Sequence, residues 1–470
     1  MTVAEFAERV TGNLPYTPTG QQEKLIAALS RFCSRNASPR SIFLLNGYAG
    51  TGKTSVTAAL VNTLHQVGIN SILLAPTGRA AKVFGNFAKR QAFTIHRKIY
   101  RQPGIGEAST IASVCENHHT DTFFIVDEAS MISTQTDSGT NILEDLIQYV
   151  YTAEGCRLIL LGDTAQLPPV GMSESPAMSI PVLHSYGLAV TKVTMTETVR
   201  QASQSGILYN ATSIRRQMKS EMLSAPVLTV SPFDDVQVLD SESLEDALTT
   251  AYSSGETDDT ILITRSNRRA VDFNNAIRRR IFDKEEELTK GELLLVAKNN
   301  YFFTSKGKNK LDFIANGDIA RIEQVYGTEW AYGLRFADLK ITLIDRNITL
   351  DVKVILNSLT SDSPALQQDK YQKLANDIID DNNKFDPLTP YGIRLKMLKQ
   401  DPHFNALQIK YAYAVTCHKA QGGQWKNVFI DMGYIPPEAY TNIDLFRWLY
   451  TAITRATTKV FFIAPTVEIK

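Results

Sequence analysis

The sequence is poor in cysteine and has no long apolar run, and each absence excludes a class of protein. The four cysteines follow no disulfide-framework spacing: Cys33, Cys115, Cys156 and Cys417. This usage is typical of proteins in a reducing cytosol. No run reaches the roughly 18 apolar residues of a membrane-spanning helix, and the first residues do not form a signal-peptide pattern. We therefore expect a cytoplasmic protein without membrane contacts.

The chain also lacks an excess of charge of either sign. Lysine plus arginine and aspartate plus glutamate number 49 each, so any binding of nucleic acid must come from a local groove. The stretch Cys115-x-x-His118-His119 has no second group of ligands and is interpreted as a polar loop, not a metal site. With 470 residues, 43% of them hydrophobic, the chain is long enough for two or more domains.

A phosphate-binding loop is present near the N-terminus. The pattern G-x-x-x-x-G-K-[ST] is matched by Gly47, Tyr48, Ala49, Gly50, Thr51, Gly52, Lys53 and Thr54. An apolar run, 41–46, precedes it and predicts a buried parallel strand, and a helical pattern follows from Lys53. Loop amides and the helix N-terminus would hold phosphates. Lys53 would reach the β- and γ-phosphates and Thr54 would bind Mg²⁺, so we expect ATP with Mg²⁺ as the cofactor.

Further side chains suit ATP hydrolysis. The apolar strand predicted at 123–126 ends in Asp127, which would bind Mg²⁺, and Glu128, which would orient or deprotonate the attacking water. A later strand leads to Gln166, whose amide would sense the γ-phosphate. Upstream, Gln22 would form a two-way hydrogen bond with adenine, because an amide both donates and accepts.

The order of apolar strands and helices predicts an α/β fold of two RecA-like lobes with parallel sheets and small inserted subdomains. The predicted parts are lobe one at 1–178, its small insertion at 97–121, the two halves of lobe two at 179–324 and 406–470, and an inserted subdomain at 325–405. This last subdomain begins with short alternating runs that suggest a small β-barrel. It continues into a helix-permissive stretch at 365–399.

Taken in order, these stretches resemble the motif series of superfamily 1B helicases, near the RecD-like and Dda-like DNA helicases. The motifs of the predicted nucleotide site are Gln22, Gly47–Thr54, Asp127–Glu128 and Gln166. The motifs that follow along the chain are Met195–Gln201, Tyr413–Gly422 and Leu449–Ala456. Asn316-Gly317-Asp318 and the β-rich segment after it resemble the SH3-like insertion of the RecD branch. Ala420 and Gly423 depart from the family pattern, which usually has serine there.

The resemblance implies a mechanism and further site residues. ATP sits between the lobes, and Arg200 and Arg455 of lobe two stabilise charge on the γ-phosphate. Closure on ATP and opening after hydrolysis move single-stranded DNA across the lobes in the 5′-to-3′ direction. Sequence-independent contacts to phosphates and bases are expected from Pro76, Thr77, His96, Thr416 and His418.

We therefore expect a 5′-to-3′ ATP-dependent DNA helicase, active as a monomer on single-stranded DNA and on tailed duplex DNA. Two alternatives stay open: an ATPase that translocates and remodels protein–DNA complexes without unwinding, and an RNA helicase of the same superfamily. A phosphotransferase is disfavoured, because a kinase has no use for the lobe-two arginines. The sequence does not distinguish roles in DNA repair, recombination and replication.

Overall fold

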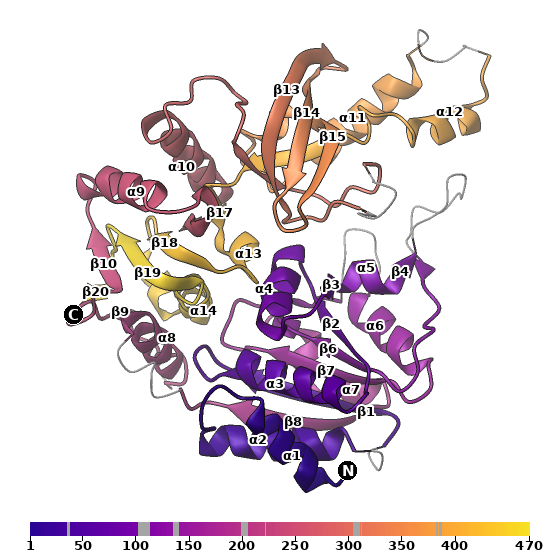
Figure 1. Cartoon of the computed structure of the whole chain (residues 1–470). Coiled ribbons are helices and arrows are strands. Elements are labelled where there is room, and N and C mark those ends of the chain that lie inside the picture. The colour runs from indigo at the N-terminus through magenta and orange to yellow at the C-terminus, as the bar shows by residue number, and fades with distance from the viewer. Residues whose placement is uncertain are drawn as a thin grey trace.

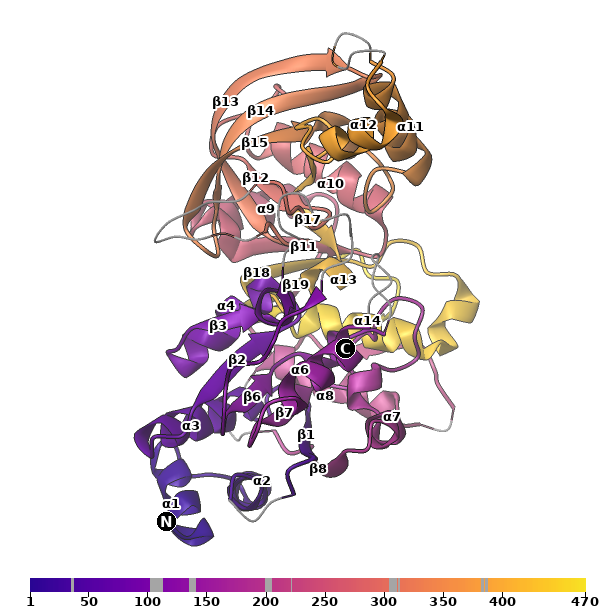
Figure 2. The ribbon, with the colours of Figure 1, turned by 90° about the vertical axis from the view of Figure 1, so that its right-hand side faces the viewer.

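The computed structural model describes most of the chain. The described residues are 1–34, 38–101, 113–134, 141–198, 205–220, 222–303, 311, 313–381, 384 and 388–470. They form two α/β lobes and a β-barrel that stands at the top of two perpendicular views (Figure 1, Figure 2). Within these ranges no helix is both long and apolar enough to cross a bilayer.

Lobe one is a six-stranded parallel sheet. In sheet order its strands are β3 (Ala92–Thr94), β2 (Ser71–Ala75), β6 (Phe123–Val126), β7 (Arg157–Gly162), β1 (Ser41–Gly47) and β8 (Ala189–Met195). Its helices are α1 (Val3–Gly12), α2 (Gly20–Phe32), α3 (Lys53–Gln66), α4 (Gly78–Ala88), α5 (Ile95–Ile99), α6 (Ile142–Tyr151) and α7 (Ile180–Ser185). Phe43 and Leu45 of β1 enter one core cluster, and Ile42 and Leu44 enter another. Strands buried on both faces are continuous apolar runs, which is why the sequence predicted them.

The small insertion predicted at 97–121 is built on a two-stranded antiparallel ribbon. Its strands are β4 (Tyr100–Arg101) and β5 (Ser113–Val114). Residues 102–112, between these strands, lie outside the described part of the chain.

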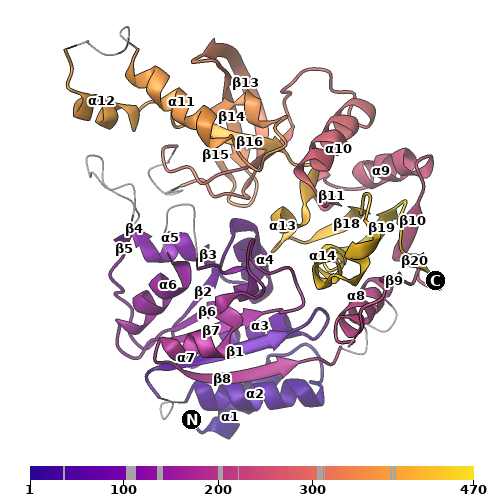
Figure 3. The same ribbon diagram turned by 180° about the vertical axis from the view of Figure 1, so that it is seen from behind.

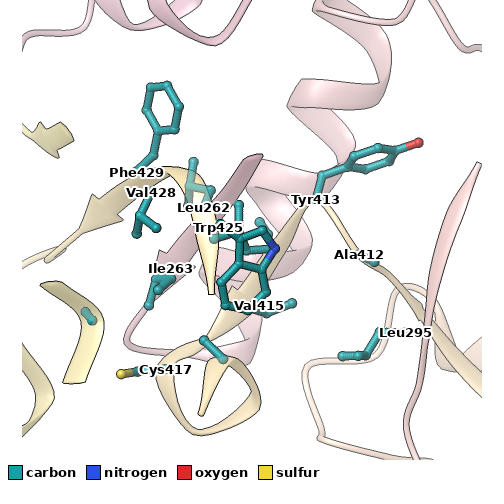
Figure 4. Packing of buried hydrophobic residues seen from close by; sticks show 14 of the residues in the cluster. Leu262, Ile263, Leu295, Ala412, Tyr413, Val415, Cys417, Trp425, Val428 and Phe429 are labelled. Atoms are coloured by element: carbon teal, nitrogen blue, oxygen red, sulfur yellow. The ribbon is translucent and has the colours of Figure 1, made fainter. Parts of the chain in front are cut away.

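Lobe two is a second parallel sheet, of five strands, so the predicted fold of two RecA-like lobes is confirmed. In sheet order its strands are β10 (Val236–Leu239), β19 (Ala456–Ile463), β18 (Trp425–Asp431), β11 (Thr260–Thr264) and β17 (Ala414–Thr416). Its helices are α8 (Gly206–Gln217), α9 (Ser243–Ser253), α10 (Asn267–Arg280), α13 (Cys417–Ala420) and α14 (Ile443–Ile453), and a short parallel pair joins β9 (Val227–Leu228) to β20 (Glu468–Ile469). Figure 4 shows Leu262, Trp425, Val428 and Phe429 among the packed side chains of the lobe-two core.

A closed β-barrel is inserted into lobe two, as predicted. Its strands are β12 (Leu293–Val296), β13 (Ile319–Ala331), β14 (Leu334–Leu343), β15 (Ile348–Ile355) and β16 (Leu407–Tyr411). Two helices between β15 and β16, α11 (Gln368–Ile379) and α12 (Tyr391–Leu398), extend to one side of it (Figure 1). They account for the helix-permissive stretch predicted at 365–399.

The limits of the lobes and of the barrel differ from the predicted ones. Lobe one continues past 178, because β8 pairs with β1 in its sheet. The barrel strands run from Leu293 to Tyr411, beyond the predicted range 325–405. An unbroken apolar run such as Leu293–Val296 does not reveal which sheet it joins, since its pairing partners lie far along the chain.

The barrel touches lobe one through charged side chains. Lys82 of α4 lies 3.0 Å from Asp345, in the turn between β14 and β15. Asp318 lies against the first residue of α4, because a Cβ on Gly78 would be 2.6 Å from the Asp318 carboxylate. Arg346 balances the Asp318 charge at 3.3 Å. The barrel is thus joined to lobe two through the chain and to lobe one through ionic contacts.

A helix side chain bonds backbone groups at the start of β17, the edge strand of the lobe-two sheet. Asn274 of α10 is 3% exposed. Its Oδ1 accepts hydrogen bonds from the amides of Tyr413 (3.0 Å) and Ala414 (2.8 Å), and its Nδ2 donates to the Ala414 carbonyl (2.7 Å). Asn274 therefore anchors the strand that leads to Thr416.

We expect Asn274→Leu to lower the free energy of unfolding of lobe two by about 3 kcal/mol or more. Three buried backbone groups would lose their partners, at roughly 1–3 kcal/mol each. Urea unfolding followed by circular dichroism measures the change. Asn275→Leu, next on the same helix and partly exposed, is the matched control and should shift the value by only about 0.5 kcal/mol. Equal losses in the two variants would contradict the anchoring role.

Candidate nucleotide and nucleic-acid sites

The predicted phosphate-binding loop joins β1 to α3 at the edge of lobe one. Gly50 and Gly52 have φ angles of 74° and 81°, a left-handed conformation that glycine adopts without strain. A Cβ on Gly47 would overlap the Lys53 side chain, whose Nζ donates to the Gly47 carbonyl. Thr51 Oγ1 donates to the Tyr48 carbonyl at 2.8 Å. The glycines thus permit a tight loop with its lysine folded over it, which fits a cradle for phosphates.

The two predicted acids follow β6 at the same edge of the sheet. Glu128 has a φ angle of 53°, and its amide donates to Asp127 Oδ1 at 2.8 Å. Burial, with the nearby Glu128 carboxylate, raises the pKa of Asp127 to about 6, against the lowering effect of Lys53. An acid held in this way is stabilised by an added cation.

Glu128 stands between the two lobes. Gln166 Nε2 of lobe one donates to Glu128 Oε2 at 3.4 Å. From lobe two, Arg455 Nη1 lies 3.7 Å from Glu128 Oε1. Arg455 is 5% exposed and donates to the carbonyls of Thr451 (3.2 Å) and Gly423 (3.3 Å). The structure therefore brings together three residues that the sequence predicted to be catalytic, and a fourth, Lys53 of lobe one, lies in the adjoining loop.

Gln22 is fully buried, with Nε2 donating to the Thr51 carbonyl (3.1 Å) and Oε1 accepting from the Thr19 amide (3.0 Å). Its side chain braces the phosphate-binding loop, and its contact with adenine stays a prediction. Arg200 lies outside the described residues, so its predicted role is also left as a prediction.

Four residues at the lobe interface were missed as site residues: Asp163, Gln421, Tyr450 and Thr451. The hydroxyl of Tyr450 contacts both the loop residue Ala49 and Asp163. Thr451 and Gln421 bond the main chain of Leu167, next to Gln166. Three of the four lie inside the lobe-two motifs that the sequence analysis identified, so the sequence did indicate these segments. Their contacts were not indicated, because they join residues more than 250 positions apart.

The lobe-one residues predicted to bind nucleic acid lie at one edge of the sheet. Pro76 and Thr77 follow β2, and His96 follows β3, the neighbouring parallel strand. Thr77 Oγ1 accepts from the Ala80 amide at 3.2 Å and begins α4. His96 is partly buried, and burial lowers its pKa, so the ring is neutral at pH 7 and offers hydrogen bonds and stacking rather than charge.

The lobe-two residues lie at the start of α13, which faces α4 (Figure 1, Figure 3). Thr416 ends β17, and His418 is exposed on the following turn. Gly422, with φ 72°, approaches lobe one so closely that a Cβ there would lie 2.8 Å from the Ala80 Cβ and 3.2 Å from Thr77 Oγ1. The predicted nucleic-acid residues of both lobes thus border the same interface.

The structure gives a physical reason for glycine at 423. The guanidinium of Arg79, on α4, lies 4.0 Å from the Trp425 ring centre. A Cβ on Gly423 would overlap that ring and lie 3.0 Å from the Arg79 side chain. The space that a serine side chain would take at 423 is therefore filled by an arginine–tryptophan contact between the lobes.

Two family models match the chain. Residues 21–225 match the AAA domain, and residues 411–463 match the UvrD-like helicase C-terminal domain. The first match contains the phosphate-binding loop and both acids, and the second contains the motifs of α13 and α14.

Relatives with known names agree with these matches. The ATP-dependent DNA helicase Dda of Enterobacteria phage T4 is 24% identical over 450 residues, which cover 89% of this chain and 93% of that protein. The ATP-dependent RecD2 DNA helicase of Deinococcus radiodurans is 32% identical over 170 residues, only 36% of this chain and 21% of that protein.

A solved structure, Pif1 helicase from Bacteroides in complex with ADP-AlF3 and ssDNA, aligns over 96% of this chain and 93% of its own. Its TM-score is 0.46 and its identity 14%. The motif series, the two domain matches and the two helicase relatives together support one assignment, a superfamily 1B helicase.

Proposed function

We propose that this protein is an ATP-dependent DNA helicase that moves 5′-to-3′ on single-stranded DNA and unwinds tailed duplexes. The observation that carries the proposal is the division of the catalytic set between the lobes, with Glu128 between Gln166 and Arg455. The names of the similar Dda and RecD2 proteins support DNA as the substrate. Since one chain contributes both halves of the nucleotide site, a monomer suffices for activity.

In this proposal each residue of the site has a distinct task. Lys53 and Arg455 bring positive charge to the terminal phosphates from opposite lobes. Thr54 and Asp127 offer oxygen atoms of the kind that Mg²⁺ prefers. Glu128 orients the attacking water and takes its proton, and Gln166 holds Glu128 in place. Bound ATP with Mg²⁺ supplies the phosphoryl group that is transferred to water.

The proposed movement follows from the residues that border the lobe interface. Pro76, Thr77 and His96 belong to lobe one, whereas Thr416 and His418 belong to lobe two. Arg455 reaches Glu128 only when the lobes are close, so opening and closing change the spacing between the two sets of contacts. Hydroxyl and ring contacts of this kind do not depend on base sequence, which a translocating protein requires.

We expect the protein, with ATP and Mg²⁺, to unwind duplex DNA that carries a 5′ single-stranded tail. The measurement is strand release from matched duplexes with 5′ or 3′ tails, in DNA and RNA versions. Preference for the 3′ tail would contradict the polarity, and preference for RNA would favour an RNA helicase. ATP hydrolysis stimulated by DNA but without strand release would favour a translocase, and hydrolysis indifferent to nucleic acid would contradict the proposal.

We expect Lys53→Ala and Arg455→Ala to abolish ATP hydrolysis but to leave binding of single-stranded DNA largely intact. Loss of an arginine that stabilises the transferring phosphoryl group typically lowers the rate by about 10³- to 10⁵-fold. Steady-state ATPase rates and fluorescence anisotropy with labelled DNA measure the two effects. Lys459→Ala, an exposed residue near Arg455 on β19, is the control. Wild-type turnover in Arg455→Ala would refute its role at the phosphate.

We expect Asp127→Asn to stabilise the nucleotide-free protein more at pH 8 than at pH 4.5. The pKa of Asp127 in the folded chain is about 6, above the ordinary 3.8. Its contribution to stability is therefore present below pH 4 and lost as the pH rises through 6. The gain at pH 8 should be on the order of 2 kcal/mol, measured by denaturant unfolding. Asp246→Asn, at an exposed site on α9, should show no such difference.

A further inference from the structure

The hydroxyl group of Tyr450 bridges two separate segments of lobe one. Tyr450 lies on α14 of lobe two and is 1% exposed. Its Oη accepts from the Ala49 amide of the phosphate-binding loop at 2.7 Å and donates to Asp163 Oδ2 at 2.6 Å. Asp163 follows β7 and is also 1% exposed. One buried oxygen atom of lobe two thus holds the loop and the end of β7 together.

The Asp163 carboxylate links this bridge to Gln166. Burial raises the pKa of Asp163, while Lys53 and the hydrogen bond from Tyr450 lower it. The other oxygen, Oδ1, accepts from the Ala165 amide at 2.9 Å. Since Ala165 immediately precedes Gln166, the same carboxylate fixes the turn that directs Gln166 toward Glu128. Within the described residues, Asp163 Oδ2 has no other hydrogen-bond donor than Tyr450.

Lobe two also holds the main chain on the other side of Gln166. The Leu167 amide donates to Thr451 Oγ1 at 2.8 Å, and the Leu167 carbonyl accepts from Gln421 Nε2 at 2.7 Å. The Oε1 atom of Gln166 is buried without a hydrogen-bond partner in the described part of the chain. Side chains of lobe two therefore hold the peptide next to Gln166, while the oxygen of Gln166 remains available for a contact in the site.

We propose that Tyr450 is a positioning residue that couples the placement of lobe two to the phosphate-binding loop and to Gln166 at once. The inference rests on the function proposed above. The hydroxyl reaches Ala49 and Asp163 only when the lobes are in register, so a shift of α14 changes both contacts together. Phenylalanine at 450 keeps the ring in its pocket and removes both hydrogen bonds.

Tyr450→Phe in the full chain, at saturating single-stranded DNA, should lower kcat for ATP hydrolysis about 10- to 100-fold, the size expected for lost hydrogen bonds that involve a buried charge. The KM for ATP should change less than about threefold. The number of ATP molecules consumed per base pair unwound should rise, because hydrolysis and lobe movement would be less tightly linked. Tyr440→Phe is the matched control, since it removes a hydroxyl that donates to the Thr466 carbonyl at 3.0 Å at an exposed site. Tyr440→Phe should keep the wild-type kcat, KM and number of ATP molecules consumed per base pair unwound.

A second variant separates positioning from folding. Thr451→Val removes the hydroxyl that accepts from the Leu167 amide. As in Tyr450→Phe, it should lower kcat and raise the number of ATP molecules consumed per base pair unwound. Wild-type kcat and coupling in Tyr450→Phe would overturn the inference. The inference would also be overturned if Tyr450→Phe lowered kcat only in proportion to a lower melting temperature and left the ATP consumed per base pair unchanged. A wild-type chain whose ATPase ignores single-stranded DNA would instead refute the proposed function, and the same assay detects that case separately.

Discussion

Hydrogen bonds between side chains of lobe two and buried backbone groups of lobe one hold the two lobes in one relative position. The Ala49 amide, and the amide and carbonyl of Leu167, find their partners across the interface. A buried peptide group without a partner is costly, so these contacts favour one register of the lobes. In this register Arg455 Nη1 lies 3.7 Å from Glu128 Oε1, which the proposed catalytic set requires.

The same edge of the lobe-one sheet concentrates groups that oppose folding. Asp127 and Asp163 end neighbouring strands, and burial raises the pKa of each. Carboxylates removed from water destabilise the chain unless cations or donors offset them. Lys53 lies near both, and Tyr450 serves Asp163. Such a site lowers the stability of the folded chain, and a bound cation would offset the buried negative charge.

The sequence predicted those parts of the site whose signal is contiguous. The phosphate-binding loop and the acids after β6 are local patterns next to apolar strands, and all of them lie where expected. The contacts of Tyr450 and Gln421 could not be predicted, because their partners are distant along the chain. The barrel limits failed for a related reason: Leu293–Val296 is an apolar run like those of the lobes, and only pairing with β13 and β16 assigns it to the barrel.

The ionic contact between the barrel and lobe one should weaken as the ionic strength rises. The pair Lys82–Asp345 is partly exposed, with side chains 38% and 10% accessible, so dissolved salt screens it. Salt also weakens contacts between a protein and phosphates through the release of counterions. For the nucleic-acid binding proposed above, the salt dependence of the affinity would then combine two ionic contacts, the one between Lys82 and Asp345 and those to the phosphates. Comparing the chain with a variant in which Lys82 and Asp345 are both neutralised would separate the salt dependence of these two contacts.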